Sequence, residues 1–257
     1  MHFAALCSVD ESVRKPELYI KNNVTGTLNL LEAMVEGKVQ KIIFSSTCAV
    51  YGDAQYLPID EKHPTKPLNP YGQSKFEAEK EIEKFGKLHG FNYVILRYFN
   101  VCGADSDGEI GDSKKPSELL VQNAVRGALG IEYFRLTCGK ADTPDGTPIR
   151  DYIDVEDLVD AHINALSYLN KGKPSGIFNL GNGKGWSVKE IVNAVKKELG
   201  VEFVVKKGKE RKGEYDKVYA DIKKAKSLLD FNPKKTLADS VKSLVKWYNN
   251  KKNGYKK

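Results

Sequence analysis

The alternation of short apolar runs with amphipathic segments constrains the fold of this chain more than any other feature. Apolar runs at residues 1–6, 41–46 and 93–99 are separated by segments of helical periodicity at 17–36 and 70–88. An order of strand, helix, strand, helix, strand is typical of a parallel sheet with helices on its faces. We therefore expect an α/β fold built on a doubly wound, Rossmann-like parallel sheet.

The pattern loosens after residue 100, where loops with glycine and proline separate the apolar runs. The later elements are expected as a helix at 117–129, a strand and then a helix within 149–166, a strand at 176–181, and helical segments near 187–199 and 222–248.

These elements predict two interwoven parts. Residues 1–99, with 151–170 returning to them, are expected to form a doubly wound part. Residues 100–150 and 171–257 are expected to form mainly a smaller C-terminal substrate lobe.

Composition favours a globular protein, because 40% of the 257 residues are hydrophobic and 29% are charged. The apolar runs are too short to span a membrane, and the first residues lack the basic region, apolar stretch and cleavage site of a signal peptide. Cys7, Cys48, Cys102 and Cys138 are too widely spaced for a zinc motif or a compact disulfide framework. We expect a soluble cytoplasmic protein with reduced thiols, no metal and no membrane partner.

The net charge of +7 arises from 41 basic and 34 acidic residues. No nucleic-acid-binding motif accompanies the basic residues, and an interspersed lysine and glutamate surface is usually a solvated face. We expect no nucleic-acid partner. A modest positive excess also suits a small phosphorylated substrate.

Tyr71 and Lys75 lie one turn apart at the start of the expected helix 70–88. Asn69 is a good N-cap and Pro70 fits the first helical position, so Tyr71 should lie near the positive end of the helix. A nearby ammonium and a positive helix end both favour a phenolate. Tyr71 is therefore a candidate proton acceptor. An amphipathic helix carrying an aromatic residue and a solvated lysine is the alternative interpretation.

Polar side chains follow two of the expected strands. Ser45, Ser46 and Thr47 end the strand at 41–46, and Asn100 follows the strand at 93–99. The carboxyl ends of parallel strands carry the working loops of such sheets, and Tyr71 begins the helix between these two strands. We expect these side chains to converge there, although local hydrogen bonding at strand ends is an alternative role for the serines and threonine.

Seven segments together resemble one family: HFAAL, NNVTGTLNLLEA, FSSTCAVYG, NPYGQSK, LRYFNVCGA, DTPDGTPIRDYIDVEDL and FNLGNGKGWSV. They occur in the order seen in UDP-glucose 4-epimerases of the extended short-chain dehydrogenase/reductase superfamily. The resemblance runs through nearly the whole chain. It implies an isomerase of galactose and nucleotide-sugar metabolism that uses NAD to interconvert UDP-glucose and UDP-galactose through a 4-keto intermediate.

The resemblance also implies roles for individual residues. Tyr71 would be the general base and acid, Lys75 would bind the nicotinamide ribose, and Thr47 would hydrogen-bond the reacting oxygen. Contacts to NAD are implied for Phe3, Ala4, Ala5, Leu6, Asn22, Ser45, Ser46, Tyr71, Lys75 and Tyr98. Contacts to the UDP-sugar are implied for Thr47, Tyr71, Asn100, Arg150, Arg211, Glu214 and Val218.

The chain departs from the family pattern at several positions. The family's first strand and glycine-rich turn are not found, so the resemblance implies an N-terminally truncated sheet in which residues 1–99, with 151–170, form only a partial dinucleotide-binding domain. We therefore doubt turnover by these 257 residues alone. Glu214 replaces the usual aspartate, Cys138 stands where an aromatic residue often stacks on uracil, and Ser117-Glu118 occupies a region that often holds asparagine or histidine.

A nucleotide-sugar 4,6-dehydratase is set aside, because it needs an acid directly after the strand-end threonine, where this chain has Cys48. Two alternatives stay open. A 4-epimerase of another UDP-sugar, such as UDP-GlcNAc or a UDP-pentose, fits the same motifs. A non-catalytic nucleotide-sugar-binding or dimerising module is also possible, because helices 17–36 and 70–88 resemble those that pair in the family's homodimer.

Overall fold

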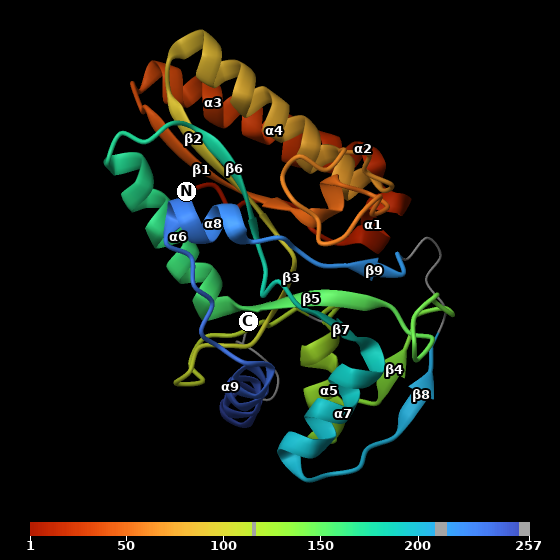
Figure 1. Cartoon of the computed structure of the whole chain (residues 1–257). Coiled ribbons are helices and arrows are strands. Elements are labelled where there is room, and N and C mark those ends of the chain that lie inside the picture. The colour runs from red at the N-terminus through yellow and green to blue at the C-terminus, as the bar shows by residue number, and fades with distance from the viewer. Residues whose placement is uncertain (115–116, 209–214, 252–257) are drawn as a thin grey trace. The chain divides into compact units, whose positions relative to one another are not determined.

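The computed structural model describes residues 1–114, 117–208 and 215–251. The chain divides into two compact units (Figure 1). Unit 1 comprises Met1–Tyr98, Ala161–Leu180 and Asp221–Phe231, and unit 2 comprises Phe99–Asp160, Gly181–Ala220 and Asn232–Lys257. The expected boundary near residue 99 coincides with the division. Residues 151–160, expected with the first part, belong to unit 2, whereas 171–180 and 221–231 belong to unit 1.

Unit 1 is built on a parallel sheet of three strands in the order β1-β2-β6. These are β1 (Lys41–Thr47), β2 (Asn92–Tyr98) and β6 (Gly176–Leu180). The register pairs Lys41 with Asn92 and Thr47 with Tyr98, so the carboxyl ends of β1 and β2 lie side by side. The α/β fold class with parallel strands is confirmed.

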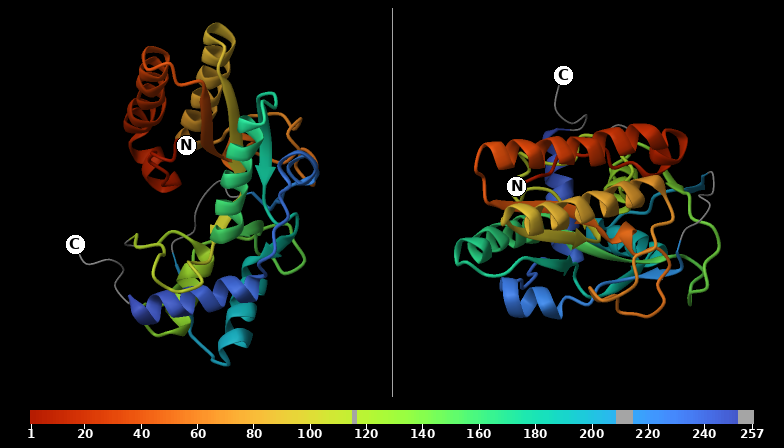
Figure 2. Two further views of the ribbon diagram at one scale, coloured as in Figure 1. Left: turned by 90° about the vertical axis from the view of Figure 1, so that its left-hand side faces the viewer. Right: turned by 90° about the horizontal axis from the view of Figure 1, so that it is seen from above.

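Helices cover both faces of this sheet, as a doubly wound fold requires. On one face, α3 (Gly26–Glu36) and α4 (Pro70–His89) run side by side (Figure 2) and bury apolar side chains against β1 and β2. On the other, Tyr168 of α6 (Val155–Asn170) packs edge-on against Phe178 of β6. The helix α8 (Lys223–Leu229) also contacts β6, through Lys224.

The prediction of a strand at residues 1–6 is wrong. Residues 1–6 form only an isolated bridge in which His2 pairs with Phe44, and two backbone hydrogen bonds join His2 to β1. A strand needs repeated pairing with a neighbour, and Phe3 is already 59% exposed. Short helical elements follow: α1 (Val9–Arg14), α2 (Pro16–Tyr19) and a π-helical turn at Ile20–Thr25 that leads into α3.

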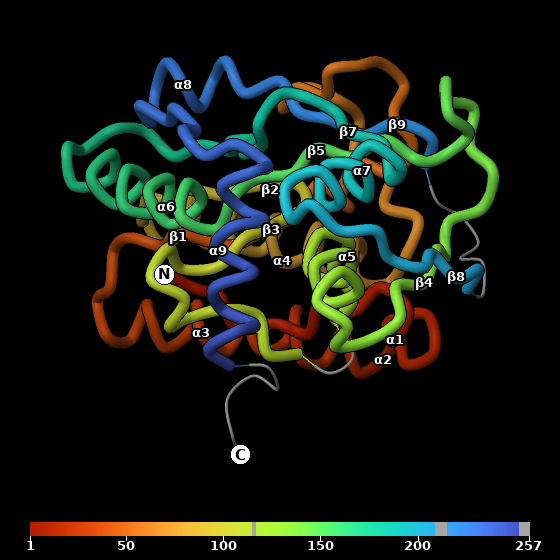
Figure 3. The backbone as a smooth tube through the Cα atoms, turned by 90° about the horizontal axis from the view of Figure 1, so that it is seen from below, coloured from red at the N-terminus to blue at the C-terminus, as the bar shows by residue number. Residues whose placement is uncertain are grey.

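Unit 2 contains a mixed sheet and three packed helices. In the sheet, β5 (Ile149–Asp154) pairs with β3 (Asn100–Cys102), β7 (Gly185–Ser187) and β9 (Lys217–Val218). A separate pair joins β4 (Phe134–Leu136) to β8 (Val205–Lys207). Figure 3 shows α5 (Leu120–Ala128), α7 (Val188–Leu199) and α9 (Leu237–Asn250) next to one another, around a core that contains the fully buried Trp247.

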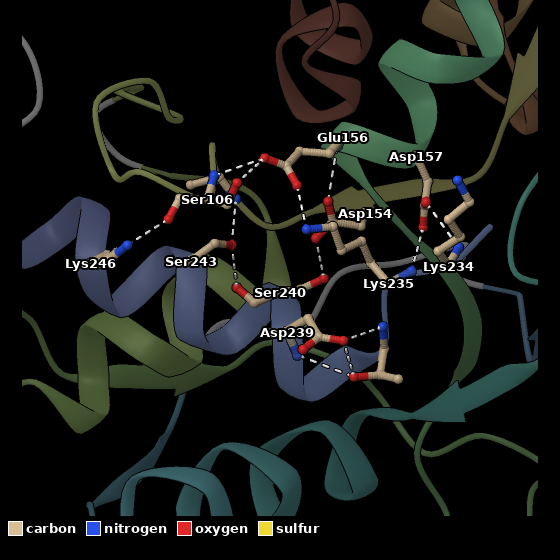
Figure 4. A network of polar contacts seen from close by, with 12 residues as sticks. Ser106, Asp154, Glu156, Asp157, Lys234, Lys235, Asp239, Ser240, Ser243 and Lys246 are labelled. Carbon is tan, nitrogen blue, oxygen red and sulfur yellow. Dashed lines mark hydrogen bonds and ion pairs between the residues drawn. The ribbon is translucent and has the colours of Figure 1, made fainter.

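Polar contacts fasten α9 to the end of β5 (Figure 4). The Ser240 hydroxyl donates to Asp154 at 2.5 Å, and the Ser243 hydroxyl accepts from the Ala104 amide at 3.0 Å. Glu156 pairs with Lys235 at 2.5 Å just before α9 begins. The bond between Ser240 and Asp154 fixes the carboxyl end of β5, the strand that carries Arg150 and Asp151.

The C-terminal helical segment is split, contrary to the single helix expected near 222–248. Asp230 ends α8 with a left-handed backbone (φ 52°), and Pro233 follows before Thr236 caps α9. No helix among the described residues is long and apolar enough to cross a membrane.

Candidate functional site

Tyr71 is placed by the start of α4. The Asn69 side chain accepts a hydrogen bond from the Gly72 amide at 2.8 Å, as expected of an N-cap. A Cβ at Gly72 would lie 2.6 Å from the carbonyl oxygen of Ala49, so only glycine allows α4 to approach the turn after β1 this closely. That close approach brings the first turn of α4 to the carboxyl end of β1.

Thr47 and Tyr71 meet at this point. Thr47 is the last residue of β1, and its hydroxyl accepts the Ala49 amide at 3.2 Å while hydrogen-bonding the Tyr71 phenol. Tyr19 lies edge-on to Tyr71, with ring centroids 6.4 Å apart. A phenol and a hydroxyl, 24 residues apart in sequence, thus form a polar pair.

The pKa of Tyr71 differs from the sequence-based expectation. Burial raises it well above the ordinary value, the Tyr98 phenol raises it further, and the hydrogen bond with Thr47 lowers it only in part. A phenolate at neutral pH is therefore not favoured by these residues alone, because desolvation outweighs the helix end. In these surroundings the Tyr71 phenol is protonated at neutral pH and can donate a hydrogen bond.

Lys75 lies one turn beyond Tyr71 and is only 3% exposed. Burial lowers the pKa of its ammonium to about 8, partly opposed by Cys7 and Glu79. Its Nζ lies 4.5 Å from the centroid of the Phe44 ring, and no described residue accepts a hydrogen bond from it. A buried cation with unused donors is suited to a ligand rich in hydroxyl oxygens.

Ser45 and Ser46 point to opposite faces of the sheet, as the alternation of a strand dictates. Ser45 contacts the ring nitrogen of His162 at 3.2 Å, whereas the Ser46 hydroxyl donates to the buried Glu79. Their hydroxyls therefore have different surroundings, although both were predicted to line the cofactor site. The Ser46 hydroxyl is engaged within the core.

The predicted N-terminal contacts Phe3, Ala4, Ala5 and Leu6 run alongside β1 and lead towards α1. Asn23 holds them: its side chain accepts the Leu6 amide at 2.8 Å and donates to the Leu6 carbonyl at 2.9 Å. It also donates to Ser74 of α4 at 3.0 Å. Asn22, the residue predicted from the sequence, is exposed and donates to Asn23 at 2.9 Å. Sequence reasoning missed the buried member of the pair.

Three residues that were predicted to contact NAD lie around His162. The Phe3 ring lies 4.9 Å from it and the Tyr98 ring 6.3 Å from it, centroid to centroid. Ser45 is its third neighbour. The structure thus places Phe3, Ser45 and Tyr98 around one buried histidine of α6, a residue that sequence reasoning missed.

Unit 2 carries a cavity of about 350 Å³. Two residues predicted to bind the substrate, Asn100 and Arg150, line it from neighbouring strands. The positions at which the chain departs from the family pattern, Ser117, Glu118 and Cys138, line it as well. Lining residues that the sequence did not suggest include Asn123, Tyr133, Arg135, Tyr152 and Val188.

Arg150, on β5, places a positive charge on the wall of this cavity. Its Nη1 donates to the Ile149 carbonyl at 2.9 Å, and its guanidinium carbon lies 5.9 Å from the Tyr215 ring. No carboxylate of a described residue forms an ion pair with it. A half-buried guanidinium with unused donors is suited to phosphate oxygens, which it binds through two parallel hydrogen bonds.

Asp151 follows Arg150 and is fully buried. Its carboxylate accepts the amides of Asn182 at 2.7 Å, Gly183 at 2.9 Å and Ala220 at 3.1 Å. Burial raises the pKa of this carboxyl to about 6, opposed by those bonds. Asp151 thereby joins the turn before β7 to the end of β9. An acid inside an apolar strand pattern was the sequence signal that could have found it.

The remaining predicted residues lie near β9. Val218 is buried and pairs with Arg150 in the parallel register of β5 and β9. Tyr219 points the other way, with its ring against Gly185. Arg211 and Glu214 lie outside the described residues. The glycine-dense segment 181–186 is a turn and a short strand before α7, whose N-cap Ser187 forms a capping box with Glu190.

Comparison with known proteins identifies the family. Residues 1–181 match the model of the NAD-dependent epimerase/dehydratase family. A UDP-glucose 4-epimerase of Lactobacillus helveticus is 43% identical over 99% of this chain and 78% of its own length. A probable UDP-arabinose 4-epimerase of Oryza sativa is 44% identical over 99% of this chain and 62% of its own length.

A solved structure gives the same result. The UDP-glucose 4-epimerase of Bifidobacterium longum, crystallised with NAD⁺ and UDP, superposes with a TM-score of 0.93 at 36% identity, covering 99% of this chain and 77% of that one. Sequence and structure agree along almost the whole chain. The chain belongs to the NAD-dependent epimerase/dehydratase family.

Proposed function

We propose that this protein interconverts UDP-glucose and UDP-galactose by inverting carbon 4 of the hexose through a 4-keto intermediate. The observation that carries the proposal is the meeting of Tyr71 and Thr47 at the carboxyl end of β1, with Lys75 one turn further along α4. This arrangement can move a proton at a hydroxyl group. The relatives named as 4-epimerases of UDP-sugars support the choice of substrate.

Tyr71 and Thr47 would both contact the reacting hydroxyl of the sugar. Thr47 holds the phenol by a hydrogen bond and would pass that bond to the sugar oxygen. Tyr71 would take the proton from the 4-hydroxyl as the carbonyl forms and return it when the alcohol is restored. Because the phenol pKa is raised in the chain alone, its role as a base depends on positive charge close by.

The residues present fit NAD. The buried ammonium of Lys75 has donors that no described residue uses, and a ribose offers hydroxyl acceptors of matching chemistry. Lys75 would hold that ribose, and Ser45, Tyr98 and the segment of residues 3–6 would border the nicotinamide end. When bound, NAD supplies the group that takes up and returns the hydrogen of carbon 4.

The cavity of unit 2 would receive the nucleotide. Arg150 and Asn100 would bind the diphosphate, since they line it from adjacent strands and Arg150 has no carboxylate partner among the residues described. Cys138 lies where the base would pack, and Arg211 and Glu214 remain proposed contacts. Burial of a ligand of this size needs a cavity of some hundreds of cubic ångströms, and about 350 Å³ is available.

A second candidate substrate is another UDP-sugar. The rice relative is named as a probable UDP-arabinose 4-epimerase, and Val218 is a small side chain at the position that the family resemblance assigns to the space around carbon 2. A small residue there would admit an N-acetyl group. Assays with UDP-glucose, UDP-GlcNAc and UDP-arabinose would rank the three.

We propose further that the protein is a cytoplasmic homodimer. Support for the dimer comes from exposed apolar side chains on the helical segments that the resemblance assigns to the interface, among them Leu18, Ile20, Leu30, Val35 and Leu88. The four cysteines form no disulfide among the described residues, which suits a reducing compartment. Light scattering should give twice the chain mass, and Leu30→Glu should give the monomer.

The proposed reaction is tested with Tyr71→Phe in the NAD-loaded enzyme. Removing the phenolic oxygen should lower kcat for UDP-galactose formation by about 10²-fold or more, the usual scale for positioned proton transfer. Tyr93→Phe is the matched control, because Tyr93 lies near the amino end of β2, away from Thr47. Near-normal turnover by Tyr71→Phe would contradict the proposal, as would equal losses in both variants.

A further inference from the structure

A buried ion pair lies beneath the candidate catalytic residues. Glu79 of α4 is 2% exposed and Arg97 of β2 is 3% exposed. Arg97 Nε donates to the two Glu79 oxygens at 3.0 and 3.2 Å, and its Nη2 donates to Oε2 at 2.5 Å. Taking both charges out of water is costly unless each is fully hydrogen-bonded. A pair kept at this cost needs a reason beyond stability.

The position of Glu79 suggests that reason. It lies four residues after Lys75, so both side chains lie on the same face of α4. It also accepts the hydroxyl of Ser46, the neighbour of Thr47 in β1. Glu79 is thus tied to both elements that carry the candidate catalytic groups.

We propose that Glu79 is a positioning residue that places a fixed, buried carboxylate on the same face of α4 as Lys75 and thereby favours the ammonium form of that lysine, with Arg97 and Ser46 holding the carboxylate in place. The inference rests on the proposed function, in which Lys75 holds the cofactor ribose and supplies charge for Tyr71.

The charges around Lys75 support this assignment. His2 and Cys7 face it from the N-terminal segment, and Glu79 lies on its own helix. Burial lowers the Lys75 pKa to about 8, and only Cys7 and Glu79 oppose that fall. Lys75 in turn lowers the pKa of His2, after burial, so His2 stays neutral and adds no repulsion at neutral pH. Of the two groups that raise the Lys75 pKa, Cys7 and Glu79, only Glu79 is a carboxylate.

Arg97 holds the Glu79 carboxylate through three hydrogen-bond contacts. Burial by itself lowers the pKa of Arg97, but the bonds to Glu79 outweigh it and raise the pKa, so the arginine is a permanent cation. The Arg97 guanidinium also stacks on Tyr51 at 4.9 Å, and the Tyr51 phenol donates to Asn179 at 2.6 Å. These contacts hold Arg97, and through it Glu79, in one orientation.

The direct test is the Lys75 pKa measured by NMR titration of ¹³C-labelled lysine, with the Lys75 signal assigned by its loss in Lys75→Arg. Glu79→Gln should lower this pKa by about one unit or more, because an opposite charge nearby is removed. Glu77→Gln is the matched control on the same helix, since Glu77 lies two residues from Lys75 and is bonded to Gln73. Glu79→Asp should restore the wild-type value.

Glu79→Gln leaves Arg97 buried without a counter-ion and can unfold the protein. Glu79→Gln with Arg97→Met removes both charges and leaves none unpaired, and the Lys75 pKa should again lie below that of the wild type. An unchanged Lys75 pKa in either folded variant would overturn the proposal and leave Glu79 a purely structural residue.

Kinetics give a second readout. In the NAD-loaded enzyme, kcat should fall above the Lys75 pKa, and in the double variant this limb should move to lower pH while KM stays near the wild-type value. A merely structural role would lower stability without moving the limb. Because the NMR titration needs no turnover, its failure is distinguishable from a failure of the proposed reaction, which Tyr71→Phe tests.

Discussion

The candidate sites of the two units place their charged side chains differently. In unit 1, Lys75, Glu79 and Arg97 are each less than 5% exposed and lie in or against the sheet core. In unit 2, Arg150 and Asn100 are half-buried on the wall of a cavity, and the buried carboxylate of Asp151 lies behind them, bonded only to backbone amides. Burial tunes proton affinity, whereas partial exposure leaves charges available to a ligand.

This contrast teaches where each kind of function can reside. A group that must exchange a proton needs surroundings that move its pKa, and unit 1 shifts the pKa of both Tyr71 and Lys75. A group that must bind a diphosphate needs unused donors near solvent, and unit 2 supplies Arg150. Substitutions that should affect only one of the two sites test this contrast.

The largest effect is expected from Arg97→Met. It leaves the Glu79 carboxylate buried without its partner, which should reduce the free energy of unfolding by about 3–5 kcal/mol. Arg150→Met, the same substitution at a half-buried arginine without a carboxylate partner, should change it by less than about 1 kcal/mol. Urea denaturation of the two variants checks the difference. Similar losses of unfolding free energy would mean that Arg97 and Arg150 contribute equally to stability, contrary to this account.

Lys75→Met should stabilise the fold while abolishing turnover. Because the folded-state pKa is about 8 and the ordinary value 10.5, burial of the cation penalises folding below about pH 8, and the penalty is relieved as pH rises from about 8 to 10.5. Methionine removes a penalty of order 3 kcal/mol at neutral pH. Denaturation at pH 7 and pH 10 should show a gain at pH 7 that shrinks at pH 10.

Asp151→Asn should weaken UDP binding without disturbing Lys75. An amide offers one acceptor oxygen in place of two, so at least one of the three backbone amides loses its partner and β9 shifts against β5. We expect about a tenfold loss of UDP affinity by calorimetry. The wild-type carboxyl is charged above about pH 6, so its affinity should fall below that pH and the variant's should not. A parallel pH dependence in both proteins would exclude this role.

The most specific effect is expected from Val218→Tyr, which should change the choice of sugar and leave the fold and UDP binding as they are. If Val218 borders the sugar, a bulky ring should reduce turnover of UDP-GlcNAc relative to UDP-glucose by about tenfold or more through steric exclusion. Tyr219→Val, on the opposite face of the strand, is the control. An unchanged ratio would show that Val218 only packs against β5.

Much of unit 1 was predictable from sequence because its signals are local. The Asn69 cap, Pro70 and the apolar period define α4, and the strand patterns define β1 and β2, so the meeting of Thr47 and Tyr71 follows from parallel order. By contrast, the pair of Glu79 and Arg97 joins residues 18 apart whose spacing carries no periodic signal. Only the packed sheet reveals it.

Other errors have equally specific causes. The π-helical turn at Ile20–Thr25 changes the phase of the helix, so periodicity could not tell that Asn23 rather than Asn22 is buried. The strand expected at residues 1–6 depended on pairing that an apolar pattern does not guarantee. In unit 2, the cavity residues Tyr133 and Arg135 lie just before and within β4, a strand of three residues that is too short to show alternation, so their place in the cavity depends on tertiary packing.

The most direct test of the division between the units is UDP titration by calorimetry, paired with turnover, on Tyr71→Phe and Arg150→Met. The account predicts that Arg150→Met weakens UDP binding by about tenfold to a hundredfold, the usual range for a hydrogen-bonded charge. It predicts that Tyr71→Phe binds UDP as the wild type does while its kcat falls by about 10²-fold or more. Equal UDP affinity in wild type and Arg150→Met, or weakened UDP binding in Tyr71→Phe, would contradict it.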